Sequence, residues 1–194
     1  MEAEGDGRAR VRNAQDLLVH LEERNEGTRA KILSRLSEPL RETIETAPRT
    51  SWIPIEDDAR FVDALIEYFG PAGAESMWCE YSARFVSTPL QRALFDGAAR
   101  IFGLTVGGLV RIIPRVWSTA YRDAGTVELQ DADENSKLLV IRDMHPEMCS
   151  RTGYLILLRG LFRGMYKLAG DESQNFRVNF MRSERLLEAE FRWS

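Results

Sequence analysis

The chain has 194 residues, with two Cys, two His and a formal net charge of −4. This length fits one domain that can fold without a disulfide or a metal. The 44% hydrophobic and 29% charged residues are typical of an ordinary soluble protein, which excludes a collagenous or mostly disordered chain. The acidic balance argues against extended binding of nucleic acid, which requires many cationic side chains.

The N-terminus and the cysteines predict a cytoplasmic protein. Three acidic residues lie within the first six positions and no apolar run follows, whereas a secretory signal needs a basic start and an apolar stretch. The longest purely apolar run, Tyr154–Leu158, is far shorter than the roughly 20 residues of a membrane span. Cys79 and Cys149 form no CxxC pair, as is typical of reduced, partly buried thiols.

The first half of the chain predicts helices. We expect residues 1–10 to form a flexible tail and residues 11–194 to form one domain. Apolar residues at helical spacing predict helices over 13–24, from 28 and from 39. Residues 51–55 contain Ile53-Pro54 and are predicted to be extended, because a residue before proline avoids the helical region.

Three consecutive acids, Glu56, Asp57 and Asp58, precede the next helical pattern. They are typical of a helix start, where carboxylates cap free N–H groups and balance the helix dipole. A catalytic or metal-binding acid cluster is the alternative. Gly70 and Pro71 are predicted to end this helix, and further helices follow over 75–86, 89–102 and 105–122.

Pro114 lies inside the last of these helical patterns. Because proline deletes one backbone hydrogen bond, we expect it to kink or split the helix near residues 111–113. A kink of this kind either frames a pocket or follows a curved core.

The C-terminal third predicts two hairpins. Apolar and polar residues alternate over 126–130 and again over 176–180 and 187–193, and residues 137–142 are rich in Leu, Val and Ile. A long helix is predicted between the hairpins, from Pro146 to about Ala169. The fold class is therefore α+β, with an N-terminal helical bundle packed on a four-stranded antiparallel sheet built from two C-terminal hairpins.

Catalytic and metal-binding motifs are scarce. The sequence contains no phosphate-binding loop and no dinucleotide fingerprint after a strand. His145 lies just before a predicted helix start that carries Cys149, and a helix N-terminus lowers the pKa of a thiol. Thiol chemistry by Cys149 and His145 is therefore the enzymatic alternative, but no oxyanion hole or orienting group is recognisable. We predict a protein that is not an enzyme and that needs neither metal nor cofactor.

Several short motifs follow one another in a characteristic order, namely Ser51-Trp52-Ile53-Pro54, Pro89-Leu90, Phe102-Gly103-Leu104-Thr105, Ile113-Pro114-Arg115 and Tyr121-Arg122-Asp123-Ala124-Gly125. This order resembles the myxobacterial paralogous family of unknown function, over about residues 28–193. That family is distantly similar to 4-vinyl-reductase, haem-nitric-oxide-binding and TRAPP-subunit domains. The resemblance implies a helical bundle against a four-stranded antiparallel sheet, and the vinyl-reductase and TRAPP relatives imply an apolar pocket.

The resemblance does not extend to the haem-binding residues. Haem-binding relatives use a helical His and a Tyr-x-Ser-x-Arg motif. In this chain Tyr81-Ser82-Ala83-Arg84 has a different spacing, and neither His lies in a strongly apolar helix. The resemblance therefore implies a related fold without haem.

Our leading hypothesis is a non-enzymatic, cytoplasmic ligand-binding or sensory domain that holds a small hydrophobic ligand between its helices and its sheet. The same aromatic residues could also form a simple core. The candidate pocket residues are Trp52, Phe61, Trp78, Phe85, Phe102, Trp117, Tyr154, Phe162 and Phe180. The alternative is a protein–protein interaction module, a homodimer or a subunit of a larger assembly. It is favoured by the small-residue pair Gly160 and Gly164 and by open sheet edges.

Overall fold

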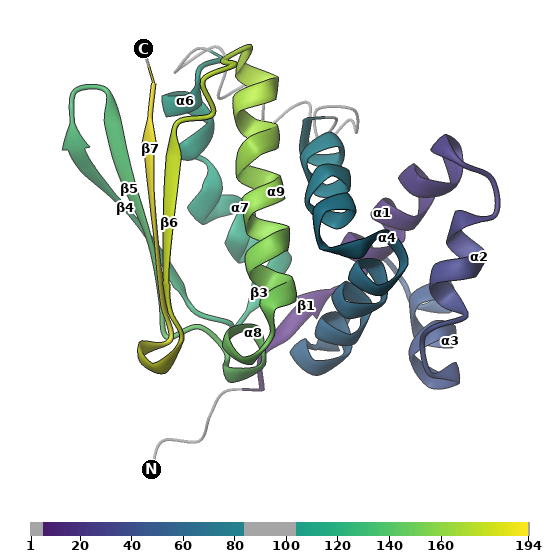
Figure 1. Ribbon diagram of the computed structural model, residues 1–194. Helices are drawn as coiled ribbons and strands as arrows, with labels where there is room; N and C mark the ends of the chain where they lie inside the picture. The colour runs from purple at the N-terminus through teal and green to yellow at the C-terminus, as the bar shows by residue number, and fades with distance from the viewer. Residues whose placement is uncertain (1–5, 84–103, 194) are drawn as a thin grey trace.

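A computed structural model describes residues 6–83 and 104–193 of the chain. Figure 1 shows the N-terminal helices at one end of the molecule, a four-stranded sheet at the other end, and α4 and α9 between them. The N-terminal helices are α1 (Val11–Arg24), α2 (Thr28–Leu33), α3 (Glu38–Thr46) and α4 (Ile55–Ala83). They bury apolar faces against one another, as their helical spacing predicts.

The helix α4 is bent at Gly70, close to where the sequence predicts its end. Gly70 has φ 69° and ψ 163°, a non-helical conformation that glycine adopts without a steric penalty. Pro71 begins the second arm of the helix, where its missing N–H costs least. The two arms of α4 therefore run in different directions, and both contact α9.

The four-stranded sheet confirms the predicted α+β class. Its strands are all antiparallel, in the order β4-β5-β7-β6. One face carries apolar pairs such as Leu139 with Ala189 and Ile141 with Leu187. These four side chains are buried toward the helices. The strands are β4 (Thr126–Asp133), β5 (Ser136–Arg142), β6 (Phe176–Met181) and β7 (Leu186–Arg192), and the turn η2 (Arg182–Glu184) joins β6 to β7.

A second sheet of three strands was not predicted. The strand β1 (Arg8–Arg10) lies between β2 (Trp52–Pro54) and β3 (Tyr121–Arg122), and it pairs antiparallel with both. The expectation of a loose tail through residue 10 is therefore wrong for residues 8–10, where Ala9 is fully buried. A three-residue strand has no detectable period, and its pairing partners lie far away in the sequence.

Two helical segments are each split in two. The split predicted near residues 111–113 is present, since α6 (Val106–Val110) and α7 (Ile113–Ala120) are separate helices, and Pro114 lies in the first turn of α7. The helix predicted from Pro146 to about Ala169 is instead α8 (Pro146–Ser150) followed by α9 (Thr152–Ala169). Arg151 between them is extended, with φ −104° and ψ 128°. Its guanidinium donates to Glu147 at 2.8 Å and to Asp63, which ties the break to α4.

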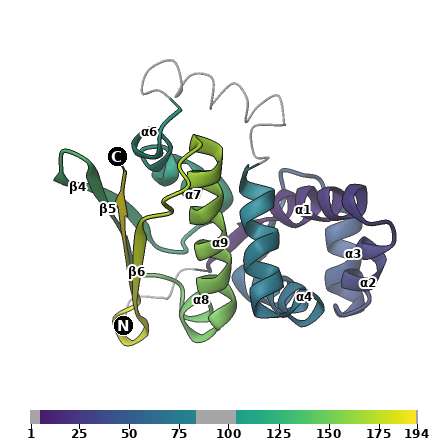
Figure 2. The same ribbon diagram turned by 45° about the horizontal axis from the view of Figure 1, so that its top comes forward.

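The small-residue pair of α9 is used inside the chain. A Cβ on Gly160 would lie 2.6 Å from the Glu75 carbonyl oxygen, and one on Gly164 would lie 2.5 Å from the Cys79 carbonyl oxygen. Figures 1 and 2 both show α9 beside α4. These glycines therefore set the contact between α9 and α4, and they no longer favour a homodimer. In the described ranges no helix is both long and apolar enough to cross a membrane.

We expect Gly164→Val to lower the free energy of unfolding by about 2–3 kcal/mol, because the added side chain overlaps α4 backbone atoms that cannot move away cheaply. Lys167→Val is the matched control on the exposed face of α9 and should cost at most about 0.7 kcal/mol. Urea unfolding followed by circular dichroism measures both. Equal losses for the two variants would contradict the proposed close contact.

Candidate functional site: an apolar cavity between the helices

A cavity of about 170 Å³ lies between α1, both arms of α4, the α6–α7 segment and α9. Its described walls are mostly apolar, with large side chains from α7 and α9 facing those of α4. They include Phe61, Trp78, Leu109, Ile113, Val116, Trp117, Leu157, Leu161, Phe162 and Met165. An apolar cavity of about 150 Å³ in another protein stays dry and binds benzene, so this space suits a molecule of one ring.

Four of the nine predicted pocket residues line this cavity. They are Phe61 and Trp78 from the two arms of α4, Trp117 from α7 and Phe162 from α9. Pro114 begins the helix that carries Trp117, so the predicted split of this segment does place side chains around a hollow. These residues lie far apart in the sequence, so the cavity forms only when α4, α7 and α9 pack together.

The other predicted pocket residues lie elsewhere. Trp52 is in β2, where the guanidinium groups of Arg10 and Arg122 lie 3.8 Å and 4.8 Å from its ring centroid. Phe180 is on β6 and packs against the sheet side of the core. Tyr154 is buried beside the cavity rather than in its described wall. The final two candidates, Phe85 and Phe102, lie outside the described residues.

Asp58 is the charged side chain of the described cavity wall. It is only 4% exposed, and the Tyr154 hydroxyl donates a hydrogen bond to its Oδ2 at 2.6 Å. Burial raises the pKa of Asp58 from 3.8 to about 6, against the opposing effect of the Tyr154 hydrogen bond. The charge of Asp58 also adds to burial in raising the pKa of Tyr121, another wall residue.

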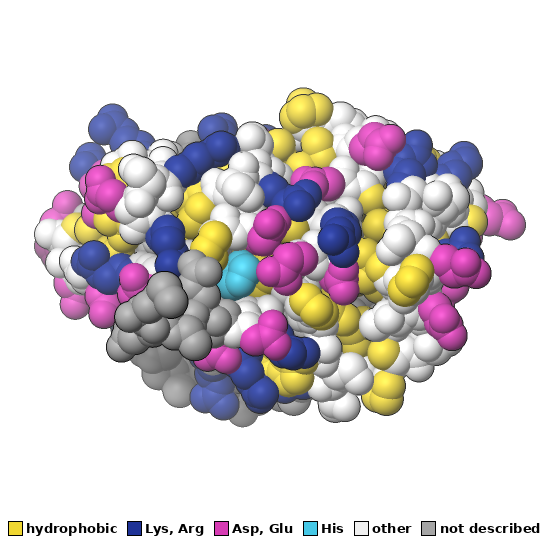
Figure 3. All heavy atoms as spheres, turned by 90° about the horizontal axis from the view of Figure 1, so that it is seen from below, with side chains coloured by type: hydrophobic (Ala, Val, Ile, Leu, Met, Phe, Trp, Pro, Cys, Tyr) yellow, Lys and Arg dark blue, Asp and Glu magenta, His cyan; other side chains and the backbone are white. Residues whose placement is uncertain are grey.

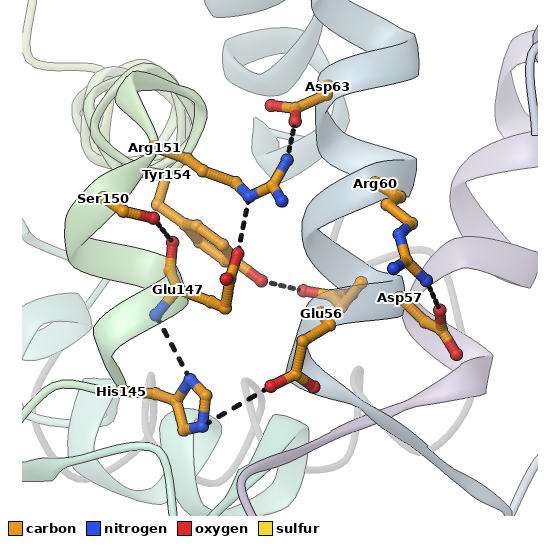
Figure 4. Close-up of polar contacts among 10 residues, drawn as sticks. Glu56, Asp57, Arg60, Asp63, His145, Glu147, Ser150, Arg151 and Tyr154 are labelled. Atoms are coloured by element: carbon orange, nitrogen blue, oxygen red, sulfur yellow. Dashed lines mark hydrogen bonds and ion pairs between the residues drawn. The ribbon is translucent and has the colours of Figure 1, made fainter.

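The three consecutive acids at the start of α4 do not act together. Asp57 pairs with Arg60 at 2.6 Å, and Glu56 lies 4.0 Å from His145 Nε2 (Figure 4), whereas Asp58 is buried against Tyr154. Figure 3 shows acidic and basic side chains interspersed over the lower face of the molecule. Among the described residues, no group of three His, Cys, Asp or Glu side chains could hold a metal ion. The alternative of an acid cluster therefore has no geometric support there.

Sequence reasoning missed the role of Asp58, although a signal was present. Asp58 shares a helical face with Phe61, Val62 and Leu65, because positions i, i+3, i+4 and i+7 lie on one side of a helix. A carboxylate on an apolar face needs a buried partner, whereas a helix cap faces water. The partner, Tyr154, is 96 residues away, so the pair itself has no local signature.

The Trp78 indole is an unsatisfied donor in the cavity wall. Its side chain is 7% exposed, and Nε1, which has almost no accessible surface, has no hydrogen-bond partner among the described residues. By contrast, Trp117 Nε1 donates to the Gly125 carbonyl at 3.2 Å, and Ser82 Oγ reaches the Cys79 carbonyl at 3.1 Å. Buried donors of this kind are nearly always paired, so the Trp78 group calls for an explanation.

Cys149 and His145 do not form an activated pair. His145 Nδ1 accepts from the Glu147 backbone N–H at 3.3 Å and so caps α8. The Cys149 thiol is buried and directed at the Met144 carbonyl, 3.8 Å away. Burial raises the pKa of Cys149, opposite to the lowering that a thiol nucleophile requires.

Comparison with known proteins identifies the fold. A scan of protein-family models finds no match, and a search of curated proteins finds no similar sequence. Among solved structures, the Fe(II) unliganded H-NOX protein from K. algicida matches with a TM-score of 0.61 and 10% identity, over 93% of this chain and 95% of that one. This chain has an H-NOX-like fold. A mutant of that K. algicida protein matches with a TM-score of 0.57, also at 10% identity, over 95% of this chain and 97% of that one.

These matches support the haem-nitric-oxide-binding part of the resemblance stated above, and at this identity they show the fold alone. They give no support to membership of the myxobacterial family. The helices and the four-stranded sheet of this chain therefore belong to an architecture whose solved neighbours here are H-NOX proteins.

The described cavity walls do not fit haem. Haem iron is held by His, Cys thiolate, Met with His, or Tyr. Neither His20 nor His145 is in the described wall, and no Lys or Arg is there to pair with propionates. Tyr81 and Tyr121 are in the wall, but burial raises the pKa of both and favours the phenol over an iron-binding phenolate.

The raised pKa of Asp58 predicts a specific pH dependence. The folded protein binds more protons than the unfolded chain between pH 4 and 6, so the stability contributed by Asp58 is complete below about pH 4 and is lost as pH rises through about 6. Asp58→Asn cannot titrate. Its free energy of unfolding should therefore rise relative to wild type by about 2–3 kcal/mol between pH 4 and 7.

Urea unfolding across this pH range measures the difference, with Asp57→Asn as the control in the same helical turn. Asp57 is water-accessible and paired with Arg60. Parallel pH curves for wild type and Asp58→Asn would show that the Asp58 carboxyl is solvated in the native state.

Tyr154→Phe should lower the free energy of unfolding by about 1.5–3 kcal/mol at pH 7.5, because it leaves a buried carboxylate without its donor. The loss should shrink at pH 4.5, where Asp58 is protonated. Tyr166→Phe is the control on the same helix, because the Tyr166 hydroxyl lies 2.7 Å from the neutral Asn175 carbonyl. A Tyr154→Phe loss as independent of pH as that of Tyr166→Phe contradicts the carboxylate bond.

Proposed function

We propose that this chain is a sensory ligand-binding domain that takes up a small, largely apolar molecule between α4, α7 and α9. The observation that carries the proposal is the apolar cavity of about 170 Å³. Ligand sites are typically concave and lined mainly by apolar and aromatic side chains, as this cavity is. A bound apolar molecule would gain packing contacts with these side chains.

The fold likeness supports the sensory part of the proposal. The solved neighbours are H-NOX proteins, which belong to the haem-nitric-oxide-binding class. Haem does not fit the described walls of this chain. We therefore propose that a small apolar molecule, and not haem, is the ligand. The cavity touches both arms of α4 on either side of Gly70, so a ligand there contacts both arms at once.

The side chains of the described cavity wall favour a binding domain over an enzyme. Among the described wall residues, Asp58 and Ser82 are hydrogen-bonded within the chain, to the Tyr154 hydroxyl and to the Cys79 carbonyl. The thiol of Cys149, four residues after His145, is disfavoured as a thiolate because burial raises its pKa. Nucleophilic catalysis needs a nucleophile and a base in contact, and the described wall shows no such pair.

Toluene tests the proposal as a simple apolar probe of one ring. At about ten times its Kd, toluene should stabilise the protein by about 1.4 kcal/mol and raise Tm by about 3–6 °C. Ala120→Phe places a ring into the cavity from the end of α7 and should abolish this rise. Differential scanning calorimetry measures both.

Ala169→Phe is the matched control, at the end of α9 and outside the described cavity wall. It should leave the response to toluene unchanged. An equal response to toluene in the Ala120→Phe variant would place binding elsewhere, and no response in wild type would reject the proposed function.

A further inference from the structure

We propose that the free edge of β6 is a docking site for an extended, acidic segment of a partner protein. The segment adds to the four-stranded sheet as a further strand and places a carboxylate on Arg159 and Arg163. The residues of this site lie outside the described wall of the apolar cavity, so the inference stands or falls independently of the proposed ligand.

The strand β6 has free backbone groups along one side. It pairs antiparallel with β7 in a regular register, and no described strand pairs with its other side. The Asn175 carbonyl accepts from the Arg192 N–H of β7 at 3.0 Å, so the odd-numbered residues of β6 face β7 and the even-numbered residues face away. The N–H and C=O groups of Val178 and Phe180 therefore point to the open edge, where an added strand would bind them.

The opposite edge of the sheet, β4, is less suited to strand addition. It carries Glu128, Asp131 and Asp133, and its pairing with β5 shifts register between the two aspartates. Charged side chains and register shifts are devices by which proteins block a sheet edge. The six residues of β6 pair without a shift and include one charged side chain, Arg177. Of the two edges, β6 is therefore the one open to a further strand.

A groove of about 320 Å³ lies beside this edge, between β6, α9 and the second arm of α4. Figures 1 and 2 both show β6 alongside α9. Phe176 and Val178 form the apolar part of the groove, and both are half-buried. Because successive side chains of a strand point to opposite faces, every second side chain of an added strand would be directed to this groove.

The polar part of the groove has an excess of positive charge. Arg159 Nε lies 3.6 Å from one Glu75 carboxylate oxygen, and Arg163 Nη1 lies 3.1 Å from the other. Arg163 Nε also donates to the Gln174 side-chain oxygen at 3.0 Å. Glu75 is the acidic residue of the described groove wall, so one carboxylate faces two guanidinium groups. Their remaining N–H groups can bind a second carboxylate, an acceptor that fits the planar guanidinium.

This charge favours a partner protein over a second copy of the chain. Antiparallel pairing of β6 with β6 of another copy would place both α9 helices on the same side of the joined sheet. Each copy would then bring Arg159 and Arg163 to that side. Like charges across an interface oppose association, whereas an acidic strand neutralises the groove.

Two peptides test the site on the full chain. The peptide Ac-TVTETVT-NH₂ presents Val, Glu and Val on one face of a strand, and Ac-TVTQTVT-NH₂ replaces only the carboxylate by an amide. Two-dimensional ¹H–¹⁵N NMR measures both dissociation constants and the hydrogen exchange of backbone amides. The Glu peptide should bind about 3–10-fold more tightly than the Gln peptide. Binding should slow exchange at the Val178 and Phe180 amides.

Val178→Pro removes an N–H that faces the open edge and leaves those that face β7. It should weaken the Glu peptide by at least about 10-fold, because the added strand loses a backbone donor and meets the proline ring. Val178→Ala is the matched control, since it shortens the same side chain but keeps the N–H, and it should bind within about threefold of wild type. Circular dichroism shows whether both variants fold.

Arg159→Gln tests the recognition of the carboxylate without changing the strand. Glu75 then neutralises Arg163, so the preference for the Glu peptide should fall below about twofold. Arg29→Gln on α2 makes the same change in net charge among the N-terminal helices, at the other end of the molecule from the sheet (Figure 1), and should leave the preference unchanged. This comparison holds even if Val178→Pro does not fold.

The outcomes either support or overturn the inference. Failure of both peptides to bind, or binding that leaves exchange at Val178 and Phe180 unchanged, would overturn strand addition at β6. Equal affinities for the two peptides, or a preference that survives Arg159→Gln, would overturn the recognition of an acidic segment. Sedimentation velocity that shows a wild-type dimer, separated by Val178→Pro, would assign the edge to a second copy instead. The proposed ligand of the cavity is untouched by any of these results.

Discussion

The structure depends on the close approach of α9 to the two arms of α4. Gly153 lies against Val62 in the first arm, and Gly160 and Gly164 lie against the second arm, so one edge of α9 has no side chains to hold the helices apart. The adjacent edge carries larger residues, among them Leu161 and Met165, which are part of the described cavity wall. The glycines of α9 thus allow close contact with α4, whereas the larger residues on the adjacent edge line the cavity.

That seam also brings together the buried polar pair. Where α9 meets the first arm of α4, the Tyr154 hydroxyl reaches Asp58. A carboxylate in this position costs solvation energy that one hydrogen bond does not fully repay, as its raised pKa shows. A purely structural contact between α4 and α9 would be more stable with two apolar residues. The buried Asp58–Tyr154 pair is therefore a contact in which the carboxylate lowers stability at neutral pH.

Much of the fold could be predicted because local patterns determine it. Alternation along the hairpins, Gly70-Pro71 and Pro114 each act within a few residues, and the four-stranded sheet and the split near Pro114 follow from them. The β1–β2–β3 sheet could not be predicted, since each strand has at most three residues and the pairing joins positions 9, 53 and 121. The break at Arg151 in the helix predicted from Pro146 could not be predicted either, because Arg151 pairs with Asp63, which lies far away in the sequence on α4.

The candidate site was harder to predict than the fold. Aromatic residues at helical spacing are equally good core residues, so sequence alone did not separate Trp78 and Trp117 from Phe180. Trp78 and Trp117 differ in hydrogen bonding, since Trp117 Nε1 donates to the Gly125 carbonyl whereas Trp78 Nε1 has no acceptor among the described residues. A fold shared at 10% identity fixes where helices lie and leaves the interior to individual side chains. In this chain the described wall contains no histidine or cysteine and places the Asp58 carboxylate among apolar side chains, so the interior differs in chemistry from a haem site even though the fold is shared.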